Sequence, residues 1–165
     1  VGYEATDGLG GVWKQCYAGV QTQSPADLYR YTDHDYPDGT PEWPSGEQVE
    51  QYLQSYADKH RLTDLYQMET TLVDMQRRPD GKPGWRLSLQ YKKASKKEED
   101  FDFVAICIGT FSNPHEPPLA GRTAFEDAGG TVLHSSQYKQ ENQTHGKDTV
   151  VVGFSKSATD VAMYA

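Results

Sequence analysis

Cysteine is scarce in this sequence, and its scarcity excludes a fold held together by disulfides. The 165 residues include two cysteines, Cys16 and Cys107. They form no Cys-x-x-Cys pair and offer no disulfide framework. Cys107 lies inside an apolar run, where a cysteine usually behaves as a small hydrophobic side chain, so we expect it to be buried.

Positive charge is also in short supply. The chain has 16 Lys and Arg residues against 24 Asp and Glu residues, for a formal net charge of −8. A surface that binds nucleic acid or an anionic membrane needs clusters of Lys and Arg, so we expect neither partner.

Long apolar runs, a signal peptide and an initiating Met are all missing. No stretch is long and apolar enough to cross a bilayer, so no membrane span is expected within these residues. The ends of the chain say little about targeting, and the working expectation is a cytoplasmic protein. The mean hydropathy of −0.79 indicates a modest core. We expect a cofactor or further chain to cover part of it.

One helix is predicted from hydrophobic periodicity. Ser45 and Gln48 have the spacing of a capping box, and apolar residues recur after them at the period of a helix. A helix is therefore expected over residues 46–60. The preceding stretch, residues 23–44, is rich in Tyr, Asp and Pro and should form helix fragments and ordered loop.

The middle of the chain has the pattern of a β-hairpin. One strand is expected near residues 66–75, and the sequence PDGKPG at 79–84 is a strong turn signal. Residues 85–91 follow, with alternate apolar side chains that predict a second strand. The charged run at 92–100 is expected to be a solvated connection, because its positive and negative charges largely cancel.

Three further stretches are predicted to be strands. Residues 101–109 form a continuous apolar run of the kind found in strands buried on both faces, ending at Gly109. Residues 131–135 and 149–153 are two shorter candidates. After the last of these, Gly153 and the start of a helix indicate a phosphate site, since free backbone N–H groups and the positive helix end converge there. Many α/β folds have a glycine at this turn, so dinucleotide binding and a purely structural turn both stay open.

The beginning of the chain has a related pattern. Strand-like residues end at Glu4, and a glycine-rich turn follows. In a dinucleotide-binding fold, a carboxylate at the tip of the second strand accepts hydrogen bonds from a ribose diol. Glu4 would otherwise be an ordinary surface carboxylate. The first strand and its glycine loop would have to precede residue 1.

Taken together, these stretches resemble the flavin-containing monooxygenases, which use FAD and NADPH. The motifs YEATDGLGGVW, LYRYTDHDYP, EWPSGEQVEQYLQSYADKH, FDFVAICIGTFSNPHEP and GTVLHSSQYK occur in the order that the family has. The last is similar to most of the family's fingerprint, in which the matching residues are Gly130, His134, Tyr138 and Lys139.

This sequence departs from the family pattern at three positions. The fingerprint's Phe would stand at Ala128, whereas Phe125 lies three residues earlier. Ser155 occupies the second glycine position of the NADPH turn, and Gln23 takes the place of an Asn at the flavin edge.

The resemblance implies an α/β fold of two dinucleotide-binding, Rossmann-like domains, here incomplete, with a β-rich insert. Residues 1–130 would be the later part of the FAD-binding domain, without its first strand and glycine loop. Residues 131–165 would contain the linker fingerprint and the start of the NADPH-binding domain.

The implied activity is insertion of one oxygen atom from O2 into a soft nitrogen or sulfur centre of a small nucleophilic substrate, through a C4a-hydroperoxyflavin. The chain by itself is not expected to turn over. One alternative is a Baeyer–Villiger monooxygenase acting on ketones, whose fingerprint carries Trp where this chain has Tyr138. The other is a non-catalytic, truncated fragment.

The resemblance also assigns roles to residues. Gln23 would place its amide near the reactive edge of the flavin, and Gly109 would end a strand where a side chain would strike the FAD. His134, Tyr138 and Lys139 would fix the linker by hydrogen bonding. No metal site is expected, because adjacent residues such as Asp33, His34 and Asp35 do not converge easily on one ion. The expected cofactor-binding residues are Glu4, Gly10, Gly11, Val12 and Trp13 for FAD, with Gly109, and Gly153, Ser155, Ser157 and Ala158 for NADPH.

Overall fold

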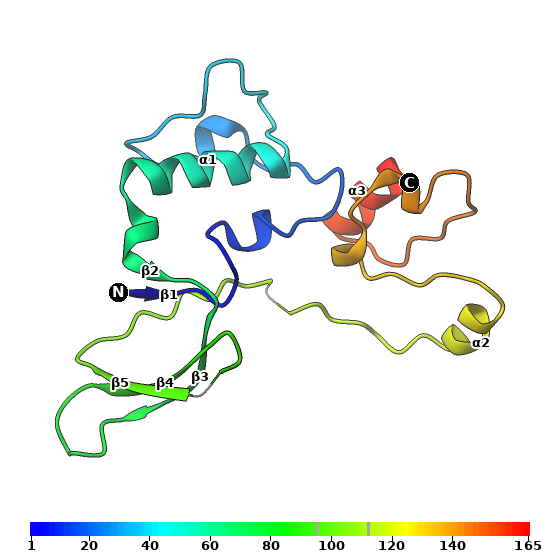
Figure 1. The fold of residues 1–165 in the computed structure, drawn as a ribbon. Helices are drawn as coiled ribbons and strands as arrows, with labels where there is room; N and C mark the ends of the chain where they lie inside the picture. The colour runs from blue at the N-terminus through cyan, green and yellow to red at the C-terminus, as the bar shows by residue number, and fades with distance from the viewer. Residues whose placement is uncertain (95, 112) are drawn as a thin grey trace. The chain divides into compact units, whose positions relative to one another are not determined.

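A computed structural model describes residues 1–94, 96–111 and 113–165, and its architecture is α/β (Figure 1). Ser95, within the predicted connection, and Ser112, within the fourth motif, lie outside the described residues. No helix in the described part of the chain is both long and apolar enough to cross a membrane.

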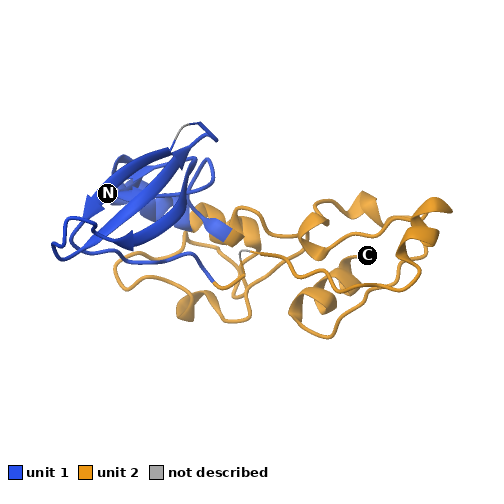
Figure 2. Ribbon diagram, turned by 90° about the horizontal axis from the view of Figure 1, so that it is seen from below, with its two compact units in different colours: residues 1–11, 53–109 blue, residues 12–52, 110–165 orange. Residues whose placement is uncertain are grey.

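The chain divides into two compact units (Figure 2). The first comprises Val1–Gly11 and Leu53–Gly109, and the second comprises Val12–Tyr52 and Thr110–Ala165. The boundary expected between residues 130 and 131 separates an FAD-binding part from an NADPH-binding part. It is defined by the cofactor bound and not by compactness, so it stays a prediction.

An antiparallel sheet of three strands forms most of the first unit. Its strands β3 (Thr70–Arg77), β4 (Trp85–Tyr91) and β5 (Lys96–Phe101) lie in sequence order. Leu87 and Leu89 of β4 are buried, as expected for alternate positions of a half-buried strand. The turn predicted at 79–84 joins β3 to β4, so the hairpin is confirmed.

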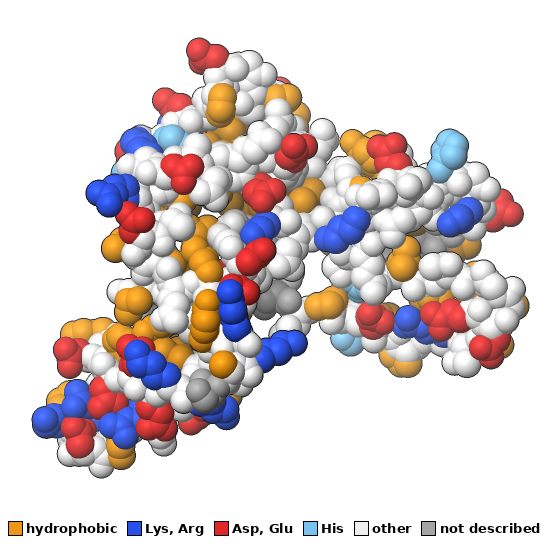
Figure 3. Space-filling view, viewed as in Figure 1, with side chains coloured by type: hydrophobic (Ala, Val, Ile, Leu, Met, Phe, Trp, Pro, Cys, Tyr) orange, Lys and Arg blue, Asp and Glu red, His pale blue; other side chains and the backbone are white. Residues whose placement is uncertain are grey.

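The charged run at 92–100 was expected to be a solvated connection, and this prediction is wrong from Lys96 onward, whereas residues 92–94 form a turn after β4. Lys96–Phe101 pairs with β4, because the charges find partners across the sheet. Arg86 donates from Nε and an Nη to both oxygens of Asp100, at 2.7 and 2.9 Å. Figure 3 shows acidic and basic side chains side by side over this part of the surface. The run therefore combines cross-strand pairing with side chains that stay mostly exposed.

A short parallel pair, β1 (Gly2–Tyr3) with β2 (Tyr66–Gln67), completes the first unit. The strand expected near 66–75 is thus divided into β2 and β3. The backbone turns between them at Glu69, whose φ is 53°. A short 3₁₀ turn, Leu62–Leu65, precedes β2.

The predicted helix is α1, Gly46–Lys59. Its capping box is present: Ser45 N donates to Gln48 Oε1 at 2.9 Å, and Gln48 N donates to Ser45 Oγ at 3.2 Å. Val49 and Tyr52 lie on its buried face. Both the helix and its start are therefore confirmed.

The second unit consists mainly of loops and short helices. Besides the first half of α1, it contains the helices α2 (Arg122–Asp127) and α3 (Lys156–Tyr164). It also contains most of the 3₁₀ turn Gly11–Trp13 and the turns Ala26–Leu28, Ser135–Gln137 and Glu141–Gln143. Residues 23–44 form short turns and loop, as expected.

Three predicted strands are absent from the described residues. Residues 102–108, 131–134 and 149–153 are extended or irregular backbone without strand partners. A strand buried on both faces needs a neighbour along each edge, and the described chain places none there. Phe103 is consequently 92% exposed and Val150 is 87% exposed.

Cys107 is exposed rather than buried. The expectation failed because it depended on the surrounding strand, which has no partner. Gly109 is exposed for the same reason, so it does not end a buried strand in this structure.

Candidate functional site

Glu4 is held at the end of β1 by its backbone and its side chain. Its N–H donates to Gln67 O at 3.1 Å, and its carbonyl accepts from Thr70 N at 2.8 Å. Its Oε1 accepts from both the N–H and the hydroxyl of Thr6, each at 2.7 Å. Because both of these bonds fall on Oε1, Oε2 can accept from a ligand. A fixed, half-exposed carboxylate of this kind suits a ribose diol.

The glycine turn after Glu4 requires glycine for its backbone conformation. Gly10 has φ of 115° and Gly11 has φ of 54°, a region that L side chains rarely adopt. Val12 is half exposed. The indole N–H of Trp13 donates to the Tyr29 hydroxyl at 3.1 Å, which fixes the ring. Gly10 and Gly11 are the last residues of the first segment of the first unit, and Val12 is the first residue of the second unit.

Gln23 is exposed, and the residue before it is a buried threonine. Thr22 N donates to Pro44 O at 2.9 Å. The Thr22 hydroxyl is buried and has no hydrogen-bond partner in the described part of the chain. Buried hydroxyls are normally bonded, so this one is an exception, and it lies directly beside Gln23 in the sequence. Sequence reasoning missed Thr22, and its only signal was its position beside Gln23.

Gly153 and Ser155 form the turn before α3. Gly153 has φ of 152°, and a Cβ there would lie 3.0 Å from the Ala158 Cβ. Ser155 is the N-cap of α3, yet its side chain makes no capping hydrogen bond. The first N–H groups of a helix lack intrahelical partners, and together with the free Ser155 hydroxyl they suit a phosphate. Ser157 lies half buried in the first turn.

Each fingerprint residue has a structural contact. His134 caps the Ser135–Gln137 turn: its Nδ1 accepts from Ser136 N at 3.2 Å, and its N–H donates to Gln137 Oε1. A Cβ on Gly130 would collide with the Phe125 ring. An aromatic ring therefore covers Gly130 although position 128 is an alanine.

Tyr138 and Lys139 bind segments that are distant in the sequence. The buried Tyr138 hydroxyl donates to Tyr164 O at 3.3 Å and lies 3.2 Å from the Thr144 hydroxyl. Lys139 Nζ donates to the carbonyls of Gln15 and Cys16, at 2.5 and 3.0 Å. A linker-fixing role requires hydrogen bonds of this type, and the role itself stays a prediction.

The residues considered as metal ligands have other partners. Arg30 binds Asp35 at 2.6 Å, and the ring of His34 lies against Tyr52, with centroids 5.3 Å apart. Among the described residues, no group of three or more His, Cys, Asp or Glu side chains could hold a metal ion.

A comparison with protein-family sequence models shows which family the chain belongs to. Residues 1–165 match the sequence model of the FMO-like family, described as flavin-binding monooxygenase-like. The chain belongs to this family. The resemblance stated from the motifs is therefore confirmed, and FAD and NADPH are confirmed as the cofactors that membership in this family implies.

Curated members of the flavin-binding monooxygenase-like family are similar over nearly the whole chain. Flavin-containing monooxygenase 3 of Rattus norvegicus is 30% identical over 97% of this chain and 32% of its own length. Senecionine N-oxygenase of Tyria jacobaeae is 27% identical over 98% of this chain and 38% of its own length. The chain thus spans only about a third of the length of these relatives.

Solved structures confirm the fold class. Tmm from Pelagibacter sp. has a TM-score of 0.85 at 21% identity, over 98% of this chain and 40% of its own. S-allyl-L-cysteine S-oxygenase from Allium sativum has a TM-score of 0.78 at 21% identity, over 98% and 42%. A cyclohexanone monooxygenase mutant from Rhodococcus sp. Phi1, solved with NADP+ bound, has a TM-score of 0.62 at 25% identity, over 74% and 23%.

Proposed function

We propose that this chain supplies parts of the FAD and NADPH sites of a monooxygenase that transfers one oxygen atom from O2 to a nitrogen or sulfur centre of a small nucleophile. The observation that carries the proposal is the family match along all of residues 1–165. Because the chain spans about a third of its relatives, the activity belongs to a protein of their length that contains it.

FAD would be held by the residues that begin the chain. Glu4 would accept hydrogen bonds from the adenosine ribose through Oε2, since Oε1 is engaged by Thr6. Gly10 and Gly11 would let the backbone approach the flavin, because neither conformation carries a side chain easily. Gln23, which is exposed, would offer its amide to the reactive edge.

NADPH would be held at the start of α3. The backbone N–H groups of the first turn and the free Ser155 hydroxyl would donate to the pyrophosphate. Gly153 would keep the turn close to Ala158, where a larger residue would push the backbone before the turn away from α3. Gly109 stays a predicted FAD-contacting position, with a φ of 73° that favours glycine.

The protein's part in the reaction is binding, orientation and exclusion of water, because no acid–base pair or metal site is required. When bound, FAD supplies hydride acceptance from NADPH and activation of O2. The residues described above would fix the two cofactors, and a water-poor pocket would protect the activated oxygen.

Nitrogen or sulfur oxygenation is favoured over ketone oxidation by the residue at position 138. The family resemblance associates Tyr at this position with the former and Trp with the latter. Tyr138 is buried, and its hydroxyl donates to Tyr164 O. The name of the Tyria relative, an N-oxygenase, agrees with this assignment.

The test uses a protein of the relatives' full length that contains residues 1–165. It should purify with FAD, oxidise NADPH in air, and convert a thioether to its sulfoxide or a tertiary amine to its N-oxide, as followed by mass spectrometry. Conversion of cyclohexanone to its lactone without sulfoxide would instead establish the Baeyer–Villiger alternative. Absence of bound flavin would overturn both and leave a non-catalytic protein. The predicted cytoplasmic location would be checked separately by fractionation.

A further inference from the structure

Asp160 is a buried carboxylate on α3 to which none of the roles above assigns a function. It is 9% exposed. It forms an ion pair with Lys156, one helical turn earlier, and the ammonium group contacts both carboxylate oxygens. The Tyr17 hydroxyl donates to Asp160 Oδ2 at 2.8 Å. A buried carboxylate is stable only when it is paired and hydrogen-bonded, so Lys156 and Tyr17 together make this burial tolerable.

The Tyr17–Asp160 bond connects two segments of different predicted roles, which lie 143 residues apart in the sequence. Tyr17 follows Gly10–Trp13, the residues expected along the flavin. Asp160 follows Gly153 and Ser155, the residues expected around the NADPH pyrophosphate. The bond is therefore a direct link from the flavin-side segment to the NADPH-side helix.

Other contacts also hold the same two segments together, so the Tyr17–Asp160 hydrogen bond is one of several interactions between them. A Cβ on Gly19 would collide with the Tyr164 ring of α3. The Tyr138 carbonyl accepts from Ala18 N at 2.8 Å, while the Tyr138 hydroxyl donates to Tyr164 O. Residues 15–19 are thus fixed by the fingerprint, including Lys139, and by α3. Tyr17 supplies the hydrogen bond between this segment and a carboxylate of α3.

The Tyr17 hydroxyl is a dependable donor. Burial, followed by the hydrogen bond to Asp160, raises the pKa of Tyr17 to about 12, although the Ser157 side chain acts in the opposite direction. The hydroxyl therefore keeps its proton throughout the range in which such an enzyme would work.

We infer that Tyr17 and Asp160 are positioning residues that hold the NADPH-binding turn in register with the flavin-side segment for hydride transfer. This inference rests on the proposed function. Hydride transfer requires donor and acceptor atoms at near-contact distance, and a displacement of about 1 Å can lower a rate about 100-fold. Loss of the link should therefore slow flavin reduction by NADPH while leaving the flavin itself bound and reducible.

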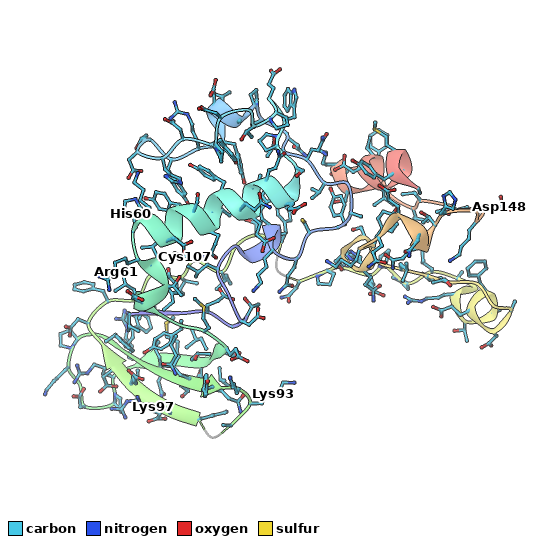
Figure 4. All side chains as sticks on the ribbon, turned by 45° about the horizontal axis from the view of Figure 1, so that its top comes forward. His60, Arg61, Lys93, Lys97, Cys107 and Asp148 are labelled. Atoms are coloured by element: carbon cyan, nitrogen blue, oxygen red, sulfur yellow. The ribbon has the colours of Figure 1, made fainter. Side chains whose placement is uncertain are left out.

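The experiment measures anaerobic flavin reduction by stopped flow in the FAD-loaded, full-length protein. Tyr17→Phe and Asp160→Asn are compared with two control variants, Tyr66→Phe and Asp148→Asn. Tyr66 and Asp148 are exposed and lie outside the sites described, and Figure 4 shows Asp148 in the loop that precedes the NADPH turn. For each protein we record the limiting reduction rate, the apparent NADPH dissociation constant, the FAD content, and reduction by dithionite.

Tyr17→Phe and Asp160→Asn should each lower the limiting rate about tenfold, with FAD content, dithionite reduction and both controls within about twofold of the parent. The double variant should be no slower than the slower single variant, because both substitutions act on the same bond: Phe lacks the donor hydroxyl, and Asn replaces the charged acceptor by a neutral one. A merely structural role would lower FAD content or slow dithionite reduction as well.

Limiting rates within about twofold of the parent in both single variants would overturn the inference. A double variant whose rate loss equals the product of the two single losses would also overturn it, because the two residues would then act independently. If Asp160→Asn fails to fold, Tyr17→Phe decides, since it leaves the Lys156–Asp160 ion pair in place. A parent protein whose flavin is not reduced by NADPH would overturn the proposed function and the inference together.

Discussion

Two stacked tyrosines in the second unit carry hydroxyls in opposite hydrogen-bonding states. The rings of Tyr36 and Tyr52 lie 4.0 Å apart between centroids. The Tyr52 hydroxyl donates to His34 O at 2.8 Å and accepts from Tyr31 N at 2.6 Å. The Tyr36 hydroxyl is buried without a partner among the described residues. The pair thus allows one chemical change, removal of a hydroxyl, to be compared at neighbouring sites.

Tyr52→Phe should destabilise the protein by about 1 kcal/mol, because it removes hydrogen bonds to the His34 carbonyl and the Tyr31 N–H, both of which are part-buried. Tyr36→Phe should be neutral or stabilise by about 1 kcal/mol, because it removes an unsatisfied hydroxyl and keeps the ring. Urea unfolding followed by circular dichroism measures both. Equal destabilisation by the two substitutions would contradict this description of the stack.

Two half-buried tyrosines should also make stability depend on pH in the alkaline range. The pKa values of Tyr3 and Tyr17 are raised from the ordinary value of 10 to about 12, mainly by burial and then by Glu99 and Asp160 respectively. The folded protein therefore keeps protons that the unfolded chain releases above pH 10. The resulting stability is complete below pH 10 and is lost as the pH rises through about 12.

The urea midpoint should accordingly fall between pH 9 and about pH 11.5, and it should fall less in Tyr3→Phe and Tyr17→Phe than in the parent. Tyr66→Phe, at an exposed position, serves as the control. A decline of the same steepness in all four proteins would show that these two hydroxyls do not cause it.

At the scale of single elements, α1 depends on a reciprocal cap at its start. Ser45→Ala should lower stability by about 1 kcal/mol, because Gln48 N then loses its acceptor, and Ser45→Asp should restore most of the loss. Gln51→Ala, on the exposed face of the same helix, should change stability by less than about 0.5 kcal/mol. Thermal unfolding of the three variants checks this, and an unaffected Ser45→Ala protein would exclude a stabilising cap.

The elements that sequence reasoning predicted correctly are those whose signals are local. Ser45 and Gln48 specify a helix start within four residues, and the turn at 79–84 specifies a hairpin within six. Strand β5 was missed because its evidence lies across the sheet, where Arg86 meets Asp100. Residues 101–109 were predicted to be a buried strand from their composition, but a strand also needs neighbours that composition does not reveal.

The same distinction applies to the candidate site. Glu4, Gly10 and Gly153 could be identified because turns with positive φ and a carboxylate after a strand have local signatures. Thr22, Tyr17 and Asp160 could not be identified in this way. Whether their side chains have hydrogen-bond partners is decided only when segments distant in the sequence pack together. The roles of the identified residues stay predictions.

At the scale of the whole molecule, the exposed apolar run should govern how the 165-residue chain behaves by itself. Phe103, Ile106, Ile108 and Phe111 are 92%, 58%, 76% and 80% exposed. Contiguous apolar surface of this kind binds hydrophobic dyes and promotes association. The chain alone should therefore enhance the fluorescence of anilinonaphthalene sulfonate and elute earlier from a sizing column as its concentration rises.

Replacing Ile106 and Ile108 by Ser should reduce both effects, whereas replacing the exposed Met163 of α3 by Ser should change them little. If the double substitution leaves dye binding unaltered, the apolar surface that binds the dye lies elsewhere on the chain. A full-length protein should bind less dye than the chain alone, if its further residues cover this run.

The ring that covers Gly130 has a practical consequence for how such proteins are recognised. Phe125 reaches the glycine from within α2, five positions away, where the family fingerprint expects an aromatic residue two positions away. A pattern search written with a rigid Phe-x-Gly interval would discard this chain, although the aromatic lid on the glycine is intact. Searches that permit the Phe to stand farther back in the preceding helix should recover further family members that a rigid interval would exclude.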